Sequence, residues 1–321
     1  MHARECGSRR LTRLADLDLR IWLADLVRVG GKVWRMPSDS GVASAARTVE
    51  DYADRVERVH AYLTEHLDRD VDLDHLAGIA CFSPFHFHRI YHALQGETVA
   101  ESVRRMRLHR AAIDLIEGAV PIARIASRAG YGSQAAFTRA FRSAYGAPPA
   151  AYRASVSSAF QGTVAIRRSE PIAVMARRHA GDYATIGGAF ERLNAMAIGR
   201  GWVGPATRYF GLYYDDPSAT PAAALRSDAC LTVPAGVDAG ADPDLRPLVI
   251  AGGVHAVLLH VGPYAELHRA YTWLYREWLP SSGEEPADAP CVEEYLNDPR
   301  TTPPPELRTE IWLPVQDSTR G

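Results

Sequence analysis

The sequence has few cysteines, almost no lysine and no long apolar run. Its four cysteines, Cys6, Cys81, Cys230 and Cys291, are widely scattered and form no CxxC pair. This spacing indicates neither a disulfide framework nor a zinc site, and we expect no metal and no cofactor. No apolar stretch approaches the ~20 residues of a membrane-spanning helix, and the charged N-terminus is unlike a secretory signal. These absences predict a cytoplasmic protein that does not enter a membrane.

The sequence does contain a charge asymmetry within an ordinary composition. Of its 321 residues, 47% are hydrophobic and 23% are charged, as in soluble globular proteins, and the net charge is −2. Residues 75–154 hold ten Arg against four Asp or Glu, which gives +6. Residues 155–321 hold fourteen Arg against twenty Asp or Glu, which gives −6. A basic region beside an acidic one suits nucleic acid on one side and a neutral or cationic ligand on the other.

Residues 122–153 predict two short helices joined by a tight turn. Gly130-Tyr131-Gly132 interrupts the helical spacing of the first helix, where glycine permits a positive φ. Ser133 is an N-cap for the second helix, which buries Phe137 and Phe141 on one face. Gln, Thr and Arg remain on the open face, as in a helix-turn-helix that enters the DNA major groove. The alternative for this segment alone is an ordinary helical hairpin with a solvated charged face.

The same plan occurs earlier in the chain, in residues 73–96. The matching pairs, each fifty residues apart, are Ser83 and Ser133, Phe87 and Phe137, Arg89 and Arg139, Tyr91 and Phe141, and Gly96 and Gly146. Two helix-turn-helix units on one chain can place two recognition helices in successive major grooves without a dimer.

Residues 49–153 resemble the AraC/XylS DNA-binding domain. The resemblance rests on the paired Ser-x-x-x-Phe-x-Arg-x-aromatic helices, on RMRLHRA at 105–111 and on YGAPPAAYR at 145–153. It implies double-stranded promoter DNA and RNA polymerase as partners. Together with the open helix faces, it assigns DNA contacts to Ser83, Phe85, His88, Arg89, Ser133, Gln134, Thr138, Arg139 and Arg142. His88 and His92 have the spacing of a zinc pair, but with no third ligand in sight we expect no metal.

The second half of the chain also repeats itself. His179-x-Gly181-x-Tyr183 recurs as His260-x-Gly262-x-Tyr264, at an offset of eighty-one, and Tyr213 recurs as Tyr295, at eighty-two. Each repeat contains one helical segment among alternating segments. We therefore expect two strand-helix-strand-strand units that join into one antiparallel sheet with helices on one face. A cleft between two such halves is a natural ligand site.

This half resembles the GyrI-like small-molecule-binding domain, through PCVEEYLNDPRTTPPPELRTEIWLPV at 290–315. The resemblance implies that Glu293 faces a ligand in an aromatic pocket. Strand alternation then puts Glu294 on the other face, exposed to solvent, although a bulge would invert the two. An acid among aromatic rings suits a lipophilic cation. The ligand-binding candidates are Glu293, Tyr295, Tyr183, Trp202, Tyr213, Tyr264 and Trp312, and no catalytic residue is assigned.

The predicted fold is multidomain, with an all-α double helix-turn-helix domain followed by an α+β GyrI-like domain. The boundaries are an N-terminal extension at 1–48, the DNA-binding domain at 49–154, a linker at 155–162, the effector domain at 163–315 and a tail at 316–321. The N-terminal extension is expected to be flexible, although the apolar spacing of residues 11–26 would also fit a dimerising helix. A regulator that senses a small lipophilic or cationic effector is the leading function. The alternatives are a hydrolase of strained-ring compounds and a protein-sequestering module.

Overall fold

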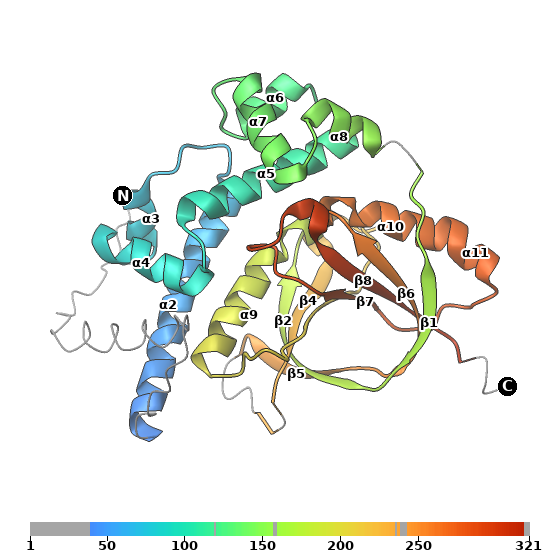
Figure 1. Ribbon diagram of the computed structural model, residues 1–321. Coiled ribbons are helices and arrows are strands. Elements are labelled where there is room, and N and C mark those ends of the chain that lie inside the picture. Colours follow the sequence, from blue (N-terminus) through green and yellow to red (C-terminus); the bar gives the residue numbers. More distant parts are fainter. Residues whose placement is uncertain (1–38, 119, 157–158, 235, 238–242, 318–321) are drawn as a thin grey trace.

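A computed structural model of the chain describes residues 39–118, 120–156, 159–234, 236–237 and 243–317 (Figure 1). The N-terminal part is helical, and the C-terminal part is one sheet with helices packed against it. This arrangement confirms the predicted multidomain class. The open question of a dimerising helix at 11–26 lies outside the described residues.

Two helix-turn-helix units form the N-terminal part, and a longer helix connects them (Figure 1). Helices α3 and α4 make the first unit, α5 is the connection, and α6 and α7 make the second. Both recognition helices, α4 and α7, end at a glycine with positive φ, Gly96 and Gly146. The helices are α2 (Asp39–Glu65), α3 (Leu73–Ile79), α4 (Pro84–Gln95), α5 (Val99–Glu117), α6 (Ile122–Arg128), α7 (Gln134–Tyr145) and α8 (Pro149–Ser155).

Each unit has its own apolar core. Phe87 and Tyr91 of α4 pack in the first core, and Phe137 and Phe141 of α7, both fully buried, pack in the second. The buried positions predicted for Phe137 and Phe141 are thereby confirmed. Burying one such side chain stabilises the fold by roughly 1.5–3 kcal/mol. Each recognition helix is therefore held by its inner face, which leaves its outer face free.

The predicted glycine turn of the second unit closes against the rest of the domain. Gly130 has φ +79°, and a Cβ there would lie 2.2 Å from Nη1 of Arg107. Arg107 in turn donates hydrogen bonds to the carbonyls of Leu67 (2.8 Å) and Arg69 (2.6 Å). Glycine is thus required at 130 both for its backbone conformation and for the close approach of a guanidinium.

The first helix begins earlier than the sequence predicts. The apolar spacing starts at Val49 and sets the expected domain boundary there, whereas α2 spans Asp39–Glu65. The helix therefore begins about three turns before the position that its apolar spacing predicts, and the domain boundary at residue 48 stays a prediction. Helical spacing of apolar residues marks only the part of a helix that is buried, and Ala-rich residues before it continue the helix by propensity.

The C-terminal part is a single antiparallel sheet of eight strands in the order β1-β6-β8-β7-β3-β4-β2-β5. The strands are β1 (Val164–Ser169), β2 (Ile172–Ala180), β3 (Tyr209–Tyr213), β4 (Arg226–Thr232), β5 (Leu245–Ile250), β6 (Gly253–Val261), β7 (Cys291–Tyr295) and β8 (Arg308–Val315). The helical elements are α9 (Gly187–Gly199), α10 (Leu267–Trp273), η4 (Leu274–Trp278), α11 (Leu279–Ser282) and the single turns η1 (Tyr183–Thr185), η2 (Ala222–Ala224), η3 (Tyr264–Glu266) and η5 (Pro304–Glu306).

The strand order reads as two equivalent halves that meet between β3 and β7. One half contains β2, α9, β3 and β4, and the other contains β6, α10, β7 and β8, which confirms the predicted repeat. Each half gains an edge strand from the other: β1 precedes β2 but pairs with β6, and β5 precedes β6 but pairs with β2. This exchange joins the two halves into one unit.

Strand β5 is the strand that the sequence signals least clearly. Its first residues, Leu245 to Pro247, pair with β2. Pro247 conceals the strand in the sequence, since proline has no backbone N–H. It is tolerated here because β5 is an edge strand of the sheet.

Helices α9 and α10 cover one face of the sheet (Figure 1). Leu193 and Met196 of α9 pack on one half, and Ala270 with Leu274 packs on the other. The opposite face carries a separate apolar cluster that includes Trp312. Arginine side chains lie over that cluster, with the guanidinium of Arg208 placed over Trp312 at 5.9 Å from the ring centroid.

The two parts of the molecule are in contact along α2 and α9, which lie side by side (Figure 1). Arg192 of α9 pairs with Asp54 and Glu57 of α2, and Arg177 of β2 also pairs with Glu57 at 2.6 Å. The N-terminal and C-terminal parts therefore share a charged interface. None of the helices in the described part of the chain has the length and apolar character needed to cross a bilayer.

Candidate functional site

The first recognition helix presents an exposed face. Its N-terminal residues project away from the core, and Phe85 is 87% exposed. Ser83, His88 and Arg89 are also exposed, whereas Phe87 between them is buried. The structure thus exposes the three predicted residues of α4 and its N-cap Ser83, as a helix that enters a groove requires.

The second recognition helix repeats this arrangement. Ser133 caps α7 by accepting a hydrogen bond from the backbone N–H of Ala136 (3.2 Å), as its N-cap assignment predicts. Gln134, Arg139 and Arg142 are exposed, and Thr138 is half-buried. The predicted residues therefore lie at the outer surface of α7, while Phe137 and Phe141 hold its inner side.

Glu293 is the centre of the second site. It lies on β7 facing α10, with 3% of its surface exposed. Its carboxylate accepts hydrogen bonds from the hydroxyls of Tyr271 (3.0 Å) and Tyr295 (2.9 Å). Burial raises the pKa of Glu293 to about 7, although the hydrogen bonds from Tyr295 and Tyr271 offset part of that rise. A single proton or cation therefore decides the charge of this site near neutral pH.

Aromatic side chains from both halves surround the acid. The hydroxyls of Tyr213 and Tyr295, which are equivalent positions of the repeat, lie 2.6 Å apart. The ring of Tyr295 meets Tyr264 edge-on at 5.4 Å between centroids and Phe190 at 5.3 Å. A cation that neutralises this carboxylate would lie among aromatic rings, which attract cations.

Tyr183 belongs to the same set but has a structural role as well. Its ring packs edge-on against Tyr213 at 4.8 Å, as Tyr264 packs on Tyr295 in the other half. Its hydroxyl donates to the carbonyl of Asp215 (2.9 Å) and accepts from the N–H of the same residue (3.0 Å). Tyr183, which lies in the turn η1, therefore packs against Tyr213 and does not contact Glu293 itself.

Two predicted ligand residues are not brought to Glu293. Trp312 pairs with Val292 across β7 and β8, so it shares the opposite face of the sheet and is 3% exposed there. Trp202 follows the C-terminal end of α9 and packs in the α9 cluster, with the guanidinium of Arg200 over its ring at 5.0 Å. The assignment of Trp312 to the pocket is wrong, because its side chain points to the sheet face opposite to that of Glu293.

The exposure predicted for Glu294 is also wrong. Its side chain does face away from Glu293, but Glu294 is only 7% exposed. Arg208 forms a two-point ion pair with it, with nitrogen–oxygen distances of 2.7 and 2.9 Å. Burying a carboxylate on an apolar sheet face is costly unless it is paired in this way.

Tyr271 and Phe190 are functional candidates that the sequence leaves unassigned. They occupy equivalent positions of the eighty-one-residue repeat, and each reaches the centre of the site, Tyr271 at Glu293 and Phe190 at Tyr295. The repeat could have identified them, because the two halves of the sheet meet between β3 and β7, and equivalent residues of both halves gather there. Within the described residues, no group of three or more His, Cys, Asp or Glu is placed to hold a metal ion.

Comparison with protein families agrees with this division of the chain. A model of the GyrI-like small molecule binding domain matches residues 163–316, and a helix-turn-helix domain model matches residues 76–155. The DNA gyrase inhibitor of Edwardsiella piscicida is 32% identical over 136 residues, which cover 42% of this chain and 84% of that protein. The chain belongs to the family of GyrI-like small molecule binding proteins, and its GyrI-like domain follows an AraC-type helix-turn-helix domain.

Two further relatives are transcriptional regulators by name. The probable transcriptional regulator YgiV of Escherichia coli is 33% identical over 110 residues, or 33% of this chain and 66% of that protein. The HTH-type transcriptional regulator YbfP of Bacillus subtilis is 36% identical over 102 residues, or 32% of this chain and 35% of that protein. The chain thus spans just under two thirds of YgiV and about a third of YbfP.

Proposed function

We propose that this protein is a transcription regulator that binds promoter DNA and senses a small lipophilic or cationic effector. The observation that carries the proposal is the buried acid Glu293, enclosed by tyrosines, in a chain that also exposes two recognition helices. The first feature fits a site for a neutralising ligand, and the second fits a DNA reader. The relatives that are named as transcriptional regulators support the regulatory part of the proposal.

The DNA-binding part uses α4 and α7 in successive major grooves of double-stranded promoter DNA. Support comes from their exposed outer faces, which carry Arg89, Arg139 and Arg142. Arginine can contact both phosphates and guanine edges, so affinity should fall as salt rises. The test is selection of duplexes from a random pool by the full-length chain, followed by fluorescence anisotropy at low and high salt. No enrichment of any sequence would remove this part of the proposal.

The effector part holds a lipophilic cation against Glu293. A cation favours the ionised carboxylate and lies among the rings of Tyr213, Tyr264 and Tyr295, where cation–π attraction adds to the ion pair. The test compares methyltriphenylphosphonium with the neutral, similarly shaped triphenylphosphine oxide on the full chain by calorimetry. Preference for the cation of about tenfold or more, which corresponds to ~1.4 kcal/mol of binding free energy, supports the site. Equal binding of the two compounds would remove the ionic role of Glu293.

We place the regulator in the cytoplasm, with RNA polymerase as a second macromolecular partner. A one-component regulator must meet both the promoter and the polymerase there. The test is a gel-mobility assay with purified polymerase. A ternary complex that migrates more slowly than both the regulator–DNA complex and the polymerase–DNA complex would support the partnership.

A second candidate function is hydrolysis of a strained ring. The observation that favours it is the carboxyl of Glu293, whose pKa of about 7 suits a general base, beside the hydroxyls of Tyr271 and Tyr295. The family's regulator names point the other way. Incubation with an epoxide or aziridine decides between the two, because turnover that Glu293→Gln abolishes would establish the hydrolase.

A further inference from the structure

We propose that Tyr295 couples the effector site to both helix-turn-helix units, through contacts on the two sides of its ring and through the loop that follows its strand. The inference rests on the proposed effector site at Glu293 and names how that site is read by the rest of the molecule. It is carried by three separate connections from the neighbours of Tyr295 to the recognition helices.

Tyr295 is in contact with the acid and with two other elements at once. Its hydroxyl donates to Glu293 (2.9 Å) and lies 2.6 Å from that of Tyr213. Its ring is met edge-on by Phe190, at an interplanar angle of 87°, and by Tyr264, at 73°. Any ligand that competes for the Glu293 carboxylate changes the hydrogen bond of Tyr295. In a close-packed interior the two neighbouring rings must then adjust.

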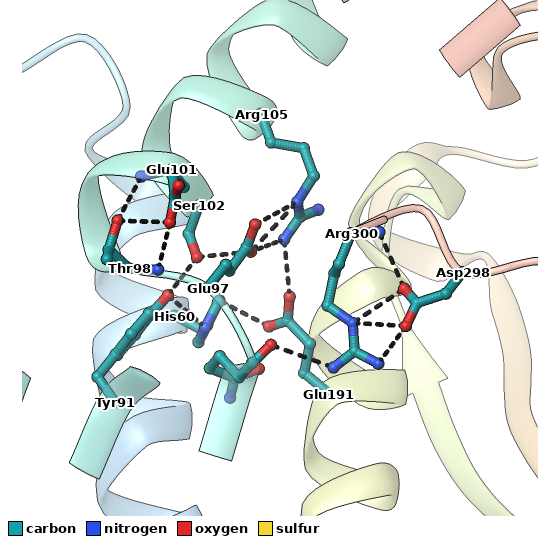
Figure 2. Close-up of polar contacts among 11 residues, drawn as sticks. His60, Tyr91, Glu97, Thr98, Glu101, Ser102, Arg105, Glu191, Asp298 and Arg300 are labelled. Atoms are coloured by element: carbon teal, nitrogen blue, oxygen red, sulfur yellow. Dashed lines mark hydrogen bonds and ion pairs between the residues drawn. The ribbon is translucent and has the colours of Figure 1, made fainter. Parts of the chain in front are cut away.

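The first connection leaves through α9. Glu191 follows Phe190 directly and turns to the DNA-binding part, where Oε2 lies 2.7 Å from Nδ1 of His60 and Oε1 lies 3.3 Å from Arg105 (Figure 2). Burial acts to raise the pKa of the Glu191 carboxyl, but His60 and Arg105 outweigh it, and the pKa lies below its ordinary value. The other ring nitrogen of His60 meets the hydroxyl of Tyr91 at 2.9 Å. Since Tyr91 belongs to α4, one chain of contacts joins Phe190 to the first recognition helix.

Inside the DNA-binding part this series of contacts closes into a cyclic network. Tyr91 donates to Ser102 (2.8 Å), Ser102 donates to Glu97 (2.6 Å), and Arg105 donates to Glu97 (2.6 Å) as well as to Glu191 (Figure 2). Tyr91, Ser102 and Glu97 are buried. A buried polar network is rigid when every member is satisfied, and removing one member is felt by the others. The network therefore transmits a change at Glu191 to both α4 and α5.

The second connection leaves through the loop after β7. Asp298 stands three residues after Tyr295 and holds Arg300 at 2.7 Å (Figure 2). Arg300 donates from Nη1 to the carbonyl of Gln95 (3.2 Å), the last residue of α4. The strand that carries Tyr295 is thus attached to the C-terminal end of the first recognition helix.

The third connection leads to the second unit. Ala265 follows Tyr264 directly and is a member of the same apolar core as Phe141 and Tyr152. The turn η3, which contains Ala265, also packs against α5 of the helix-turn-helix part. A movement of Tyr264 on Tyr295 therefore reaches the core that supports α7.

The test is amide hydrogen exchange of the full-length chain, which needs neither DNA nor effector. Tyr295→Phe keeps the ring and removes the hydroxyl. We expect exchange to rise in both Pro84–Gln95 and Gln134–Tyr145 by about fivefold or more, the lower end of typical coupling between sites. We then introduce Tyr295→Phe into a variant that already carries Glu191→Gln and Arg300→Gln. There the response of α4 should disappear while that of α7 persists, because only the first two connections are cut.

The matched control is Glu294→Gln, which alters a buried acid of the same strand that is paired with Arg208 on the other face. It should leave exchange in both recognition helices within about twofold of the original. Unchanged exchange in Tyr295→Phe overturns the proposal, and so does an α4 response that survives the two interface substitutions. If Tyr295→Phe unfolds the domain, Tyr213→Phe replaces it, because it removes only the hydroxyl partner of Tyr295. Methyltriphenylphosphonium and DNA titrations remain the separate tests of the proposed function.

Discussion

Gly211 lies directly opposite Glu293 in the register of β3 and β7, and the two occupy equivalent positions of the repeat. A Cβ at Gly211 would lie 2.9 Å from the hydroxyl of Tyr295 and 2.8 Å from Cε2 of Tyr213. One half of the domain therefore supplies the acid, and the other supplies the space in which the tyrosine hydroxyls meet.

Gly211→Ala should damage the site without changing its chemistry. The added methyl displaces Tyr213 or Tyr295, and overpacking of this kind costs typically ~1–3 kcal/mol. Urea unfolding and methyltriphenylphosphonium titration should both show the loss. Gly187→Ala is the control, because a Cβ there meets nothing within 4 Å. Equal behaviour of the two variants would contradict the packing described at Gly211.

Stability should depend on pH through Glu293. Its pKa is raised from 4.5 to about 7 in the folded protein. Between these values the folded state binds more protons than the unfolded chain, so stability falls as pH rises through this window and levels off above it. The loss is of the order of 3 kcal/mol, at ~1.36 kcal/mol for each pKa unit.

This dependence is measured by urea unfolding of the original chain and of Glu293→Gln at about pH 5 and about pH 8. The Gln variant should lose less stability than the original chain over this interval, because it has no carboxyl to ionise. A pH dependence identical in both proteins would mean that Glu293 titrates normally.

Tyr271→Phe should raise the pKa of Glu293 further. The Tyr271 hydroxyl donates to Oε1 at 3.0 Å and lowers the pKa, so its removal favours the protonated acid. Carbon-detected NMR of the Glu293 carboxyl gives the midpoint directly. Tyr275→Phe is the control, since that hydroxyl lies 3.1 Å from the sulfur of Cys291. An unchanged midpoint in Tyr271→Phe would show that this hydroxyl does not stabilise the ionised carboxylate of Glu293.

Arg89→Ala and Arg139→Ala should each weaken DNA binding. Both side chains are exposed on recognition helices, and a base-reading arginine contributes typically ~1–3 kcal/mol. Anisotropy titrations at two salt concentrations measure the affinity and its salt dependence. Arg276→Ala, an exposed arginine of the effector part, should change neither. If Arg89→Ala behaves like this control, α4 does not read DNA.

The sequence predicts most of the fold because its two halves each repeat themselves. The fifty-residue repeat locates both recognition helices, and Phe137 and Phe141 are buried as their spacing indicates. The eighty-one-residue repeat locates the two halves of the sheet. Element boundaries are less well predicted, since α2 continues to Asp39 beyond its apolar stripe and Pro247 hides the start of β5.

The candidate site is predicted only in part, because the sequence does not show which distant residues form ion pairs or strand pairs with each other. Nothing near Glu294 indicates that Arg208 will cover it. Alternation along β7 places Glu293 and Tyr295 together, but the side on which Trp312 lies depends on how β8 pairs with β7. The contact between Glu191 and His60 joins two parts whose patterns are independent, so neither pattern predicts it.

The central claim is that a cation at Glu293 changes DNA binding by α4 and α7. The most direct measurement is the affinity of the full-length chain for its selected duplex, with and without saturating methyltriphenylphosphonium, in the original chain, Glu293→Gln and Glu294→Gln. We predict that the cation shifts the affinity by about fivefold or more in the original chain and in Glu294→Gln, and that Glu293→Gln abolishes the shift. A shift that persists in Glu293→Gln, or that is lost equally in both variants, would contradict the account.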